Sequence, residues 1–141
     1  MYHKVTIIGN LGRDPEMRYT PSGTAVTDFS VATNRKWTNK DGTPGEETVW
    51  FRCSAWGKTA ETVNQYLTKG RQVYVEGRLN PDSASGGPRV FTRGDGTPGA
   101  QYEVTIERIQ FLGGRGEGDV SDSSVSQQEP QTGGDEGDIP F

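Results

Sequence analysis

The stretch of sequence that decides the fold runs from residue 48 to residue 58 and reads Thr48-Val49-Trp50-Phe51-Arg52-Cys53-Ser54-Ala55-Trp56-Gly57-Lys58. In an extended strand, successive side chains point to opposite faces. One face of such a strand carries small and apolar side chains, as a protein core requires: Val49, Phe51, Cys53 and Ala55. The opposite face carries Trp50, Arg52, Ser54 and Trp56. The alternation therefore predicts a β-strand with one buried face.

The opposite face of this strand is unusual, because it places a guanidinium between two indoles. Flat π-systems beside cationic groups suit unpaired nucleobases, whose rings stack while their phosphates bind positive charge. Aromatic side chains and arginine are also enriched in subunit interfaces. The strand alone therefore leaves two alternatives open, nucleic-acid binding and burial between protomers.

The composition indicates one small β domain followed by a disordered segment. The chain has 141 residues, of which 30% are hydrophobic and 20 are glycine, a lean and turn-rich composition. The single cysteine, Cys53, lies on the core face and excludes an intramolecular disulfide. One histidine and one cysteine exclude the usual zinc ligand sets within one chain. No signal-peptide core and no apolar run of membrane-spanning length occur, so we expect a soluble, cytoplasmic protein.

The negative net charge of −4 is unevenly distributed along the chain. Residues 1–112 contain 14 basic and 12 acidic residues, a net charge of +2. Residues 113–141 contain 1 basic and 7 acidic residues, a net charge of −6. The part expected to fold is therefore mildly basic, which permits phosphate contacts without requiring them.

Hydrophobic periodicity predicts five strands and one helix. The predicted strands cover residues 4–11, 25–37, 47–58, 72–79 and 101–112, with a shorter extended segment around Arg18. Residues 80–100 read as a long Pro/Gly/Ser-rich connection that contains Arg89-Val90-Phe91-Thr92-Arg93. Helical spacing over residues 58–69, followed by Gly70, predicts one short amphipathic helix. The inward positions of the last strand change face near Glu107-Arg108, which indicates a β-bulge. The pentapeptide Asp-Gly-Thr-Pro-Gly occurs at residues 41–45 and again at 95–99, and predicts the same turn at two hairpin tips.

This order of elements predicts an all-β fold, a five-stranded OB-fold barrel whose only helix lies between the third and fourth strands. A β-sandwich is the alternative, but it normally has more strands and no such helix. We place the domain at residues 1–112. Oligonucleotide binding is typical of this barrel.

The end of the chain differs from the rest. Residues 113–134 are rich in Gly, Ser, Gln and acidic residues and contain no aromatic, which predicts a disordered linker. The last seven residues read Asp135-Glu136-Gly137-Asp138-Ile139-Pro140-Phe141. A partner pocket with a basic rim could bind the terminal ring and carboxylate together. The alternative is a solvated tail.

Several stretches resemble the bacterial-type single-stranded-DNA-binding proteins, in the same order from end to end: Asn10-Leu11-Gly12-Arg13-Asp14-Pro15-Glu16, Trp50-Phe51-Arg52, Trp56-Gly57-Lys58, Tyr66-Leu67-Thr68-Lys69-Gly70, Val73-Tyr74-Val75-Glu76-Gly77 and Asp138-Ile139-Pro140-Phe141. The resemblance implies an OB-fold homotetramer that wraps unpaired DNA without sequence preference and uses no cofactor. It implies roles in replication, recombination, repair and the SOS response. It also implies that residues 135–141 dock the enzymes of these processes, and that the protein is associated with the nucleoid.

By local alignment, the resemblance places the stacking aromatics of the family at Trp37, Trp50, Trp56 and Phe91. Phe91 lies in the basic and aromatic segment Arg89-Val90-Phe91-Thr92, behind an unusual insert at residues 80–88. The candidate phosphate contacts are Arg35, Lys36, Arg52, Lys58, Arg89 and Arg93. The candidate docking residues are Asp135, Glu136, Asp138, Ile139, Pro140 and Phe141.

Two other classes of function are the alternatives, a nuclease and a specialised binding module. A nuclease would need clustered carboxylates for a metal ion, and no recognisable constellation is formed by Asp14, Glu16, Asp28, Glu46 and Glu47. The only histidine, His3, has no credible nucleophile to activate. We therefore expect no enzyme and no metal site. The second alternative is a primosomal, RNA-binding or adaptor module, and the residues alone do not separate DNA from RNA.

Overall fold

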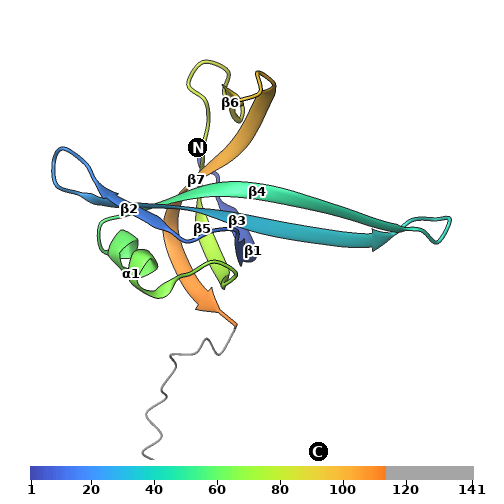
Figure 1. Cartoon of the computed structure of the whole chain (residues 1–141), viewed down its shortest axis with the longest axis horizontal. Helices are drawn as coiled ribbons and strands as arrows, with labels where there is room; N and C mark the ends of the chain where they lie inside the picture. The colour runs from blue at the N-terminus through green and yellow to red at the C-terminus, as the bar shows by residue number, and fades with distance from the viewer. Residues whose placement is uncertain (114–141) are drawn as a thin grey trace, which may run out of the picture.

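The computed structural model describes residues 1–113, and its strands curl into a closed barrel with two long projections (Figure 1). The strands are β1 (Val5–Leu11), β2 (Glu16–Tyr19), β3 (Ala25–Thr38), β4 (Pro44–Trp56), β5 (Gln72–Asn80), β6 (Arg89–Thr92) and β7 (Pro98–Leu112). The single helix of the described residues, α1 (Lys58–Tyr66), follows β4. The predicted all-β OB-fold with one short helix is confirmed. The segment expected to be extended around Arg18 forms the short strand β2. The connection expected over residues 80–100 contains a further short strand, β6, which the periodicity did not predict.

The barrel closes through the order β1-β5-β7-β4-β3-β2, with β1 returning to pair with β3. The return contact joins Asn10 to Ala32 and Leu11 to Val31. The pairing of β4 with β7 is parallel, and the other pairings are antiparallel. Because β4 lies between β3 and β7, one of its faces lines the barrel and the other points outward.

The core consists of the inward side chains of the five long strands. The fully buried members include Phe29, Val31, Cys53, Ala55, Val73, Val75 and Val104. Ala60 and Val63 of α1 pack onto the same cluster. The buried Thr27 hydroxyl donates a hydrogen bond to the Ala60 carbonyl at 2.7 Å, which ties the helix to β3. The core face predicted for residues 48–58 is thus confirmed for Cys53 and Ala55 and for Phe51, which is partly buried against the cluster, whereas the partly buried Val49 lies outside it.

Two glycines lie where neighbouring strands come closest. A Cβ at Gly9 would lie 2.2 Å from the carbonyl oxygen of Ala32, and a Cβ at Gly77 would lie 2.2 Å from that of Thr105. Gly77 also marks a register shift between β5 and β7 that leaves Glu107 without a partner on β5. The predicted bulge near residue 107 is confirmed, and glycine opposite it permits the close approach of the backbones.

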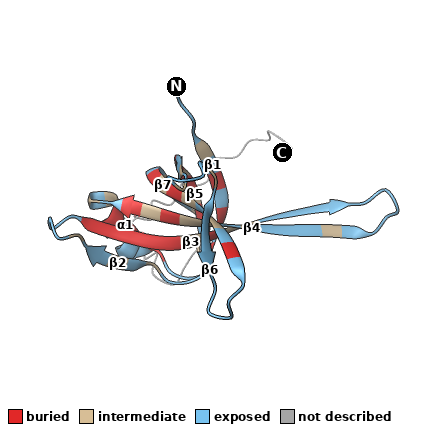
Figure 2. Cartoon of the chain, turned by 90° about the horizontal axis from the view of Figure 1, so that it is seen from above, coloured by how far each residue is buried: buried red, intermediate tan, exposed pale blue. Residues whose placement is uncertain are grey.

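Two antiparallel pairs extend beyond the barrel, and Figure 2 shows that they are largely exposed along their length. The first arm is formed by residues 34–48 of β3 and β4, and the second arm by residues 89–101 of β6 and β7. The predicted turn at each Asp-Gly-Thr-Pro-Gly sequence lies at the tip of an arm. Strands β4 and β7 begin at Pro44 and Pro98, about three residues earlier than predicted, because the chain pairs immediately after each tight turn.

The helix is shorter than the predicted range of residues 58–69. It ends at Tyr66, and Leu67 is already extended with φ −96° and ψ 142°. Leu67 is nevertheless buried in the core. Its apolar side chain fits the helical spacing, and for this reason the pattern alone could not locate the end of the helix.

Burial determines the chemistry of the only cysteine. It raises the pKa of the Cys53 thiol to about 12 from an ordinary value of 9.0. Above pH 9 the unfolded chain therefore loses a proton that the native chain keeps, and the free energy of unfolding falls as the pH rises toward 12.

We expect an aromatic disulfide reagent at about pH 8 to leave Cys53 of the native protein unmodified and to label it quickly in denaturant. The buried, protonated thiol is a poor nucleophile, and absorbance of the released thiolate measures the reaction. Cys53→Ala gives the background rate. Equal labelling rates for the native and denatured protein would contradict the buried position.

Candidate nucleic-acid interface

The outward face of β4 presents the two predicted indoles to solvent. Trp50 is 53% exposed and Trp56 is 49% exposed. Arg52 and Ser54 lie between them and are partly buried. Along the barrel wall, Trp56 pairs with Val26 of β3, which in turn pairs with Arg18 of β2. The two indoles therefore flank a polar strip that continues onto neighbouring strands.

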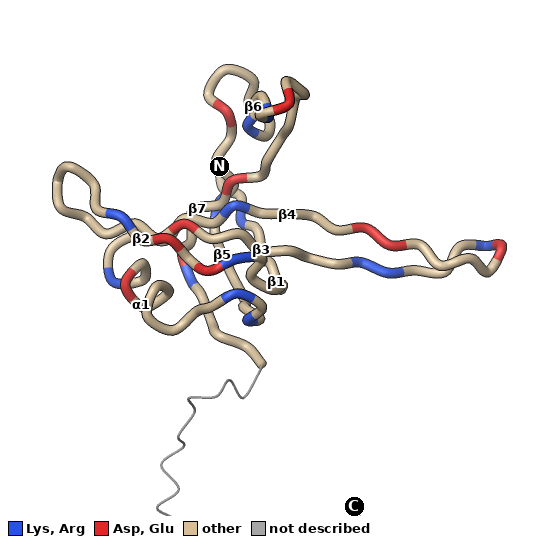
Figure 3. Tube along the Cα trace, viewed as in Figure 1, with Lys and Arg blue, Asp and Glu red and all other residues tan. Residues whose placement is uncertain are grey.

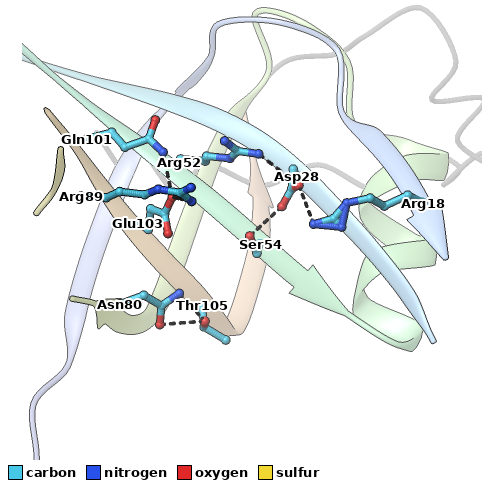
Figure 4. Close-up of polar contacts among 9 residues, drawn as sticks. All are labelled: Arg18, Asp28, Arg52, Ser54, Asn80, Arg89, Gln101, Glu103 and Thr105. Atoms are coloured by element: carbon cyan, nitrogen blue, oxygen red, sulfur yellow. Dashed lines mark hydrogen bonds and ion pairs between the residues drawn. The ribbon is translucent and has the colours of Figure 1, made fainter. Parts of the chain in front are cut away.

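The polar strip is organised by Asp28 of β3, whose side chain is only 10% exposed. Ser54 Oγ donates a hydrogen bond to Asp28 Oδ1 at 2.6 Å. Asp28 Oδ2 lies 3.2 Å from Nη2 of Arg18 and 3.5 Å from Nη2 of Arg52 (Figure 4). One shielded carboxylate thus binds two guanidinium groups, that of Arg52 between Trp50 and Trp56 and that of Arg18 on β2.

A second polar cluster adjoins the first on β7. Glu103 pairs in register with Arg52. Its Oε1 accepts a hydrogen bond from Gln101 Nε2 at 2.7 Å and lies 3.4 Å from Arg89 Nη1. Asn80 and Thr105 hydrogen-bond to each other nearby (Figure 4). The strip consequently extends from β2 across β3 and β4 to β7 and β6.

The other two predicted aromatics lie on the arms. Trp37 is 38% exposed on the first arm, and its Nε1 donates to Asn39 Oδ1 at 2.9 Å. The Arg35 guanidinium carbon lies 5.3 Å from the Trp37 ring centroid. Phe91 is 39% exposed on the second arm, with the Arg93 guanidinium carbon 5.8 Å from its centroid. Each arm therefore combines one aromatic ring with one nearby arginine.

The predicted site residues thus fall into three groups. Trp50, Arg52 and Trp56 share the barrel wall, and Lys58 is exposed at the start of α1 directly after Trp56. The first arm holds Arg35, Lys36 and Trp37, and the second arm holds Arg89, Phe91 and Arg93. The predicted docking residues 135–141 lie outside the described residues. Sequence reasoning missed Arg18 and Asp28 as members of the site, because only the strand register places them beside Arg52.

Acidic residues lie close to the basic ones along the strands of the barrel and the arms (Figure 3). Of the six predicted phosphate contacts, three are in ion pairs: Arg52 with Asp28, Arg89 with Glu103, and Arg35 with Glu47 at 3.3 Å. Within residues 1–113 no group of His, Cys, Asp or Glu side chains could hold a metal ion. Nor is any helix in this part of the chain long and apolar enough to cross a membrane.

Solved structures share this architecture. Plasmodium falciparum SSB in complex with ssDNA superposes with a TM-score of 0.64 at 26% identity, covering 80% of this chain and 97% of that one. A deletion variant of the single-stranded DNA binding protein from Thermus aquaticus gives a TM-score of 0.60 at 32% identity, covering 79% of this chain and 51% of that one.

Curated relatives match over most of this chain. The single-stranded DNA-binding protein of Wolinella succinogenes is 40% identical over 116 residues, covering 82% of this chain and 67% of the relative. That of Neisseria meningitidis is 42% identical over 115 residues, covering 82% and 62%. Single-stranded DNA-binding protein 1 of Chlorobaculum tepidum is 41% identical over 133 residues, covering 91% and 76%. The chain thus spans about two thirds of the length of the first two relatives.

The sequence profile of the Single-strand binding protein family matches residues 2–112, which is almost the whole described barrel with its two arms. Together with the fold, the outward indoles and the relatives at about 40% identity, this match shows that the chain belongs to the single-strand binding protein family.

Proposed function

We propose that this protein binds single-stranded DNA without sequence preference, by stacking bases on Trp37, Trp50, Trp56 and Phe91. The observation that carries the proposal is the pair of half-exposed indoles on β4, with Arg52 held between them. Relatives named for single-stranded DNA binding, and a structural neighbour in complex with ssDNA, support this choice of ligand.

Stacking explains why such binding needs no sequence code. Every base has a π-face, and each base stacked on an aromatic side chain contributes about 1–3 kcal/mol. Trp50 and Trp56 are six residues apart on one strand, a separation of about 20 Å at the usual rise. They therefore receive different bases of one strand. Duplex DNA binds poorly in this scheme, because its bases already stack on one another.

The ion pairs on this surface are compatible with phosphate binding. A guanidinium has five N–H donors, so Arg52 can keep its contact with Asp28 and still donate to a phosphate oxygen. Phosphate contacts from Arg35, Lys36, Arg52, Lys58, Arg89 and Arg93 then make binding salt-dependent. On single strands the log–log slope is about −0.7 per phosphate neutralised.

We further propose that the protein assembles as a homotetramer. Ile8 on β1 is 54% exposed, and it pairs in register with Tyr74 of β5. Within residues 1–113, β1 pairs with β5 along its length but with β3 only at Asn10 and Leu11. Its second edge is thus open over most of the strand, and an apolar side chain beside an open edge suits contact with another copy.

Residues 113–134 are proposed as a linker and residues 135–141 as a docking tip for replication, recombination and repair enzymes. The support is the tip sequence, in which three acids precede an apolar Ile-Pro-Phe end. This proposal places the protein in the cytoplasm, associated with the nucleoid.

We expect Trp50→Ala and Trp56→Ala each to weaken binding of oligo-dT at fixed salt by about 5- to 100-fold, the loss of one stacking contact. Fluorescence anisotropy with a labelled oligonucleotide measures the affinity, and thermal melting checks the fold. Tyr66→Ala, which removes an exposed aromatic of α1, is the matched control. Parent-like affinity of both tryptophan variants would refute the stacking mechanism. The affinities for RNA and for duplex DNA of matched length, measured in the same assay, show whether single-stranded DNA is the preferred ligand.

For the assembly, light scattering after size exclusion should give about four times the chain mass of 15.4 kDa for the parent. Ile8→Glu should lower this mass, because it buries a charge against the partner copy. Val90→Glu, a charge at an exposed apolar position of the second arm, should leave it unchanged. A monomeric parent would contradict the tetramer.

Removal of residues 135–141 should abolish capture of replication and repair enzymes and leave oligo-dT affinity at low salt equal or modestly higher, since the tail carries negative charge. Pull-down with purified enzymes and the anisotropy assay measure the two effects. Deletion of residues 123–129 removes the same length and keeps the tip. Equal capture by both shortened chains would count against a docking role.

A further inference from the structure

The tips of the two arms are built from one repeated sequence. The repeat has the form aromatic-Thr-x-x-Asp-Gly-Thr-Pro-Gly and covers nine residues, not only the shared pentapeptide. The two copies read Trp37-Thr38-Asn39-Lys40-Asp41-Gly42-Thr43-Pro44-Gly45 and Phe91-Thr92-Arg93-Gly94-Asp95-Gly96-Thr97-Pro98-Gly99. They form the ends of the first arm and the second arm, which leave the barrel in different directions (Figure 1).

The two tips adopt the same turn. In the first, Asp41 Oδ1 accepts hydrogen bonds from the backbone N–H and the hydroxyl of Thr43, at 3.0 and 2.6 Å. In the second, Asp95 Oδ1 accepts the same pair from Thr97, again at 3.0 and 2.6 Å. The turn is thus closed by its own residues. It fixes the register so that the first residue of each repeat lies opposite the last.

The result of this register is an aromatic ring placed across the ribbon from a glycine. Trp37 pairs with Gly45, and Phe91 pairs with Gly99. A Cβ at Gly45 would lie 2.3, 2.4 and 2.7 Å from Cε2, Nε1 and Cζ2 of Trp37. These three atoms are bonded neighbours at similar distances, so the glycine lies against the face of the indole and not against its edge.

The second arm shows the same crowding. A Cβ at Gly99 would lie 2.8 and 3.0 Å from Cζ and Cε2 of Phe91, and 3.0 Å from the guanidinium carbon of Arg93. Real Cβ atoms do not approach so closely, and each ring thus occupies space that only a glycine leaves free.

The surroundings of each ring suit one stacked nucleotide. The guanidinium carbons of Arg35 and Arg93 lie 5.3 and 5.8 Å from the centroids of Trp37 and Phe91, close enough for the phosphate of a stacked base. On the first arm, a shallow hollow of about 460 Å³ is lined by Lys36, Trp37, Thr38, Pro44, Gly45 and Glu46. The hollow therefore offers space beside the ring next to a second cation.

We propose that the two arms are copies of one base-stacking module, in which Gly45 and Gly99 are the positioning residues. The proposal rests on the single-stranded DNA binding proposed above. Each glycine lets the ring on the opposite strand lie against the ribbon backbone, which covers one π-face and leaves the other for a base. A side chain at either position forces the ring away from the ribbon, and the base must then reorder it on binding.

The test compares Gly45→Ala and Gly99→Ala with Gly94→Ala, which lies in the second tip and has nothing within 4 Å of its added Cβ. We expect each of the first two to weaken oligo-dT binding about three- to tenfold, part of one stacking contact, and Gly94→Ala to bind like the parent. Thermal melting should be equal for all three, because the arms lie outside the core.

Double variants distinguish an effect of the glycine that acts through the ring from a general disturbance of the arm. If Gly45 acts through the ring, Gly45→Ala added to Trp37→Ala causes no further loss, and Gly99→Ala added to Phe91→Ala behaves likewise. A full additional loss in both backgrounds would overturn the proposal. So would parent-like affinity of both single glycine variants.

Proton NMR of the free protein measures whether each ring lies against its glycine. The α-protons of Gly45 and Gly99 should be shifted upfield by the ring currents and should return to ordinary positions in Trp37→Ala and Phe91→Ala respectively. Unshifted α-protons in the parent would refute the ring placement. If the parent itself fails to bind oligo-dT, single-stranded DNA binding fails and this module with it. If the parent binds and only the glycine effects are missing, the module alone is wrong.

Discussion

The pairing of β3 with β4 is the constraint on which the rest of the structure depends. It runs without interruption from the partners Val26 and Trp56 to Thr38 and Pro44. Near the barrel it seals the core, because Cys53 and Ala55 of β4 face inward and are fully buried. Beyond the barrel the same pairing has no core to cover and becomes the first arm. One ladder therefore fixes the position of three tryptophans relative to the barrel.

The sequence could predict what depends on alternation within a strand. The inward Cys53 and the outward Trp50 and Trp56 follow from a period of two, and the bulge at Glu107 follows from a change of that period. Contacts between strands distant in sequence could not be predicted in this way. The pairing of Arg18 and Arg52 with Asp28 depends on the register of three strands, and no local pattern contains it.

These ion pairs bear on how a mildly basic surface can bind a polyanion. Asp28 and Glu103 reduce the net charge beneath the arginines, which weakens nonspecific attraction to any anion. They also hold the guanidinium groups in place, which lowers the ordering cost of a phosphate contact. On such a surface the aromatic rings carry a larger share of the affinity. Under the proposed stacking mechanism, a ligand whose bases are free to stack is then favoured over a duplex of the same charge.

The arms add a further constraint, because an exposed two-stranded ribbon is at best marginally stable by itself. Glycine within a strand weakens pairing through its conformational freedom. In both arms this cost falls where a ring lies against the glycine, and an aromatic ring placed in this way is known to restore stability at glycines of edge strands. The contact that stabilises the ribbon is thus the same contact that orients the ring. In the proposed module, the pairs Trp37 with Gly45 and Phe91 with Gly99 therefore serve both the firmness of the arm and the presentation of a π-face.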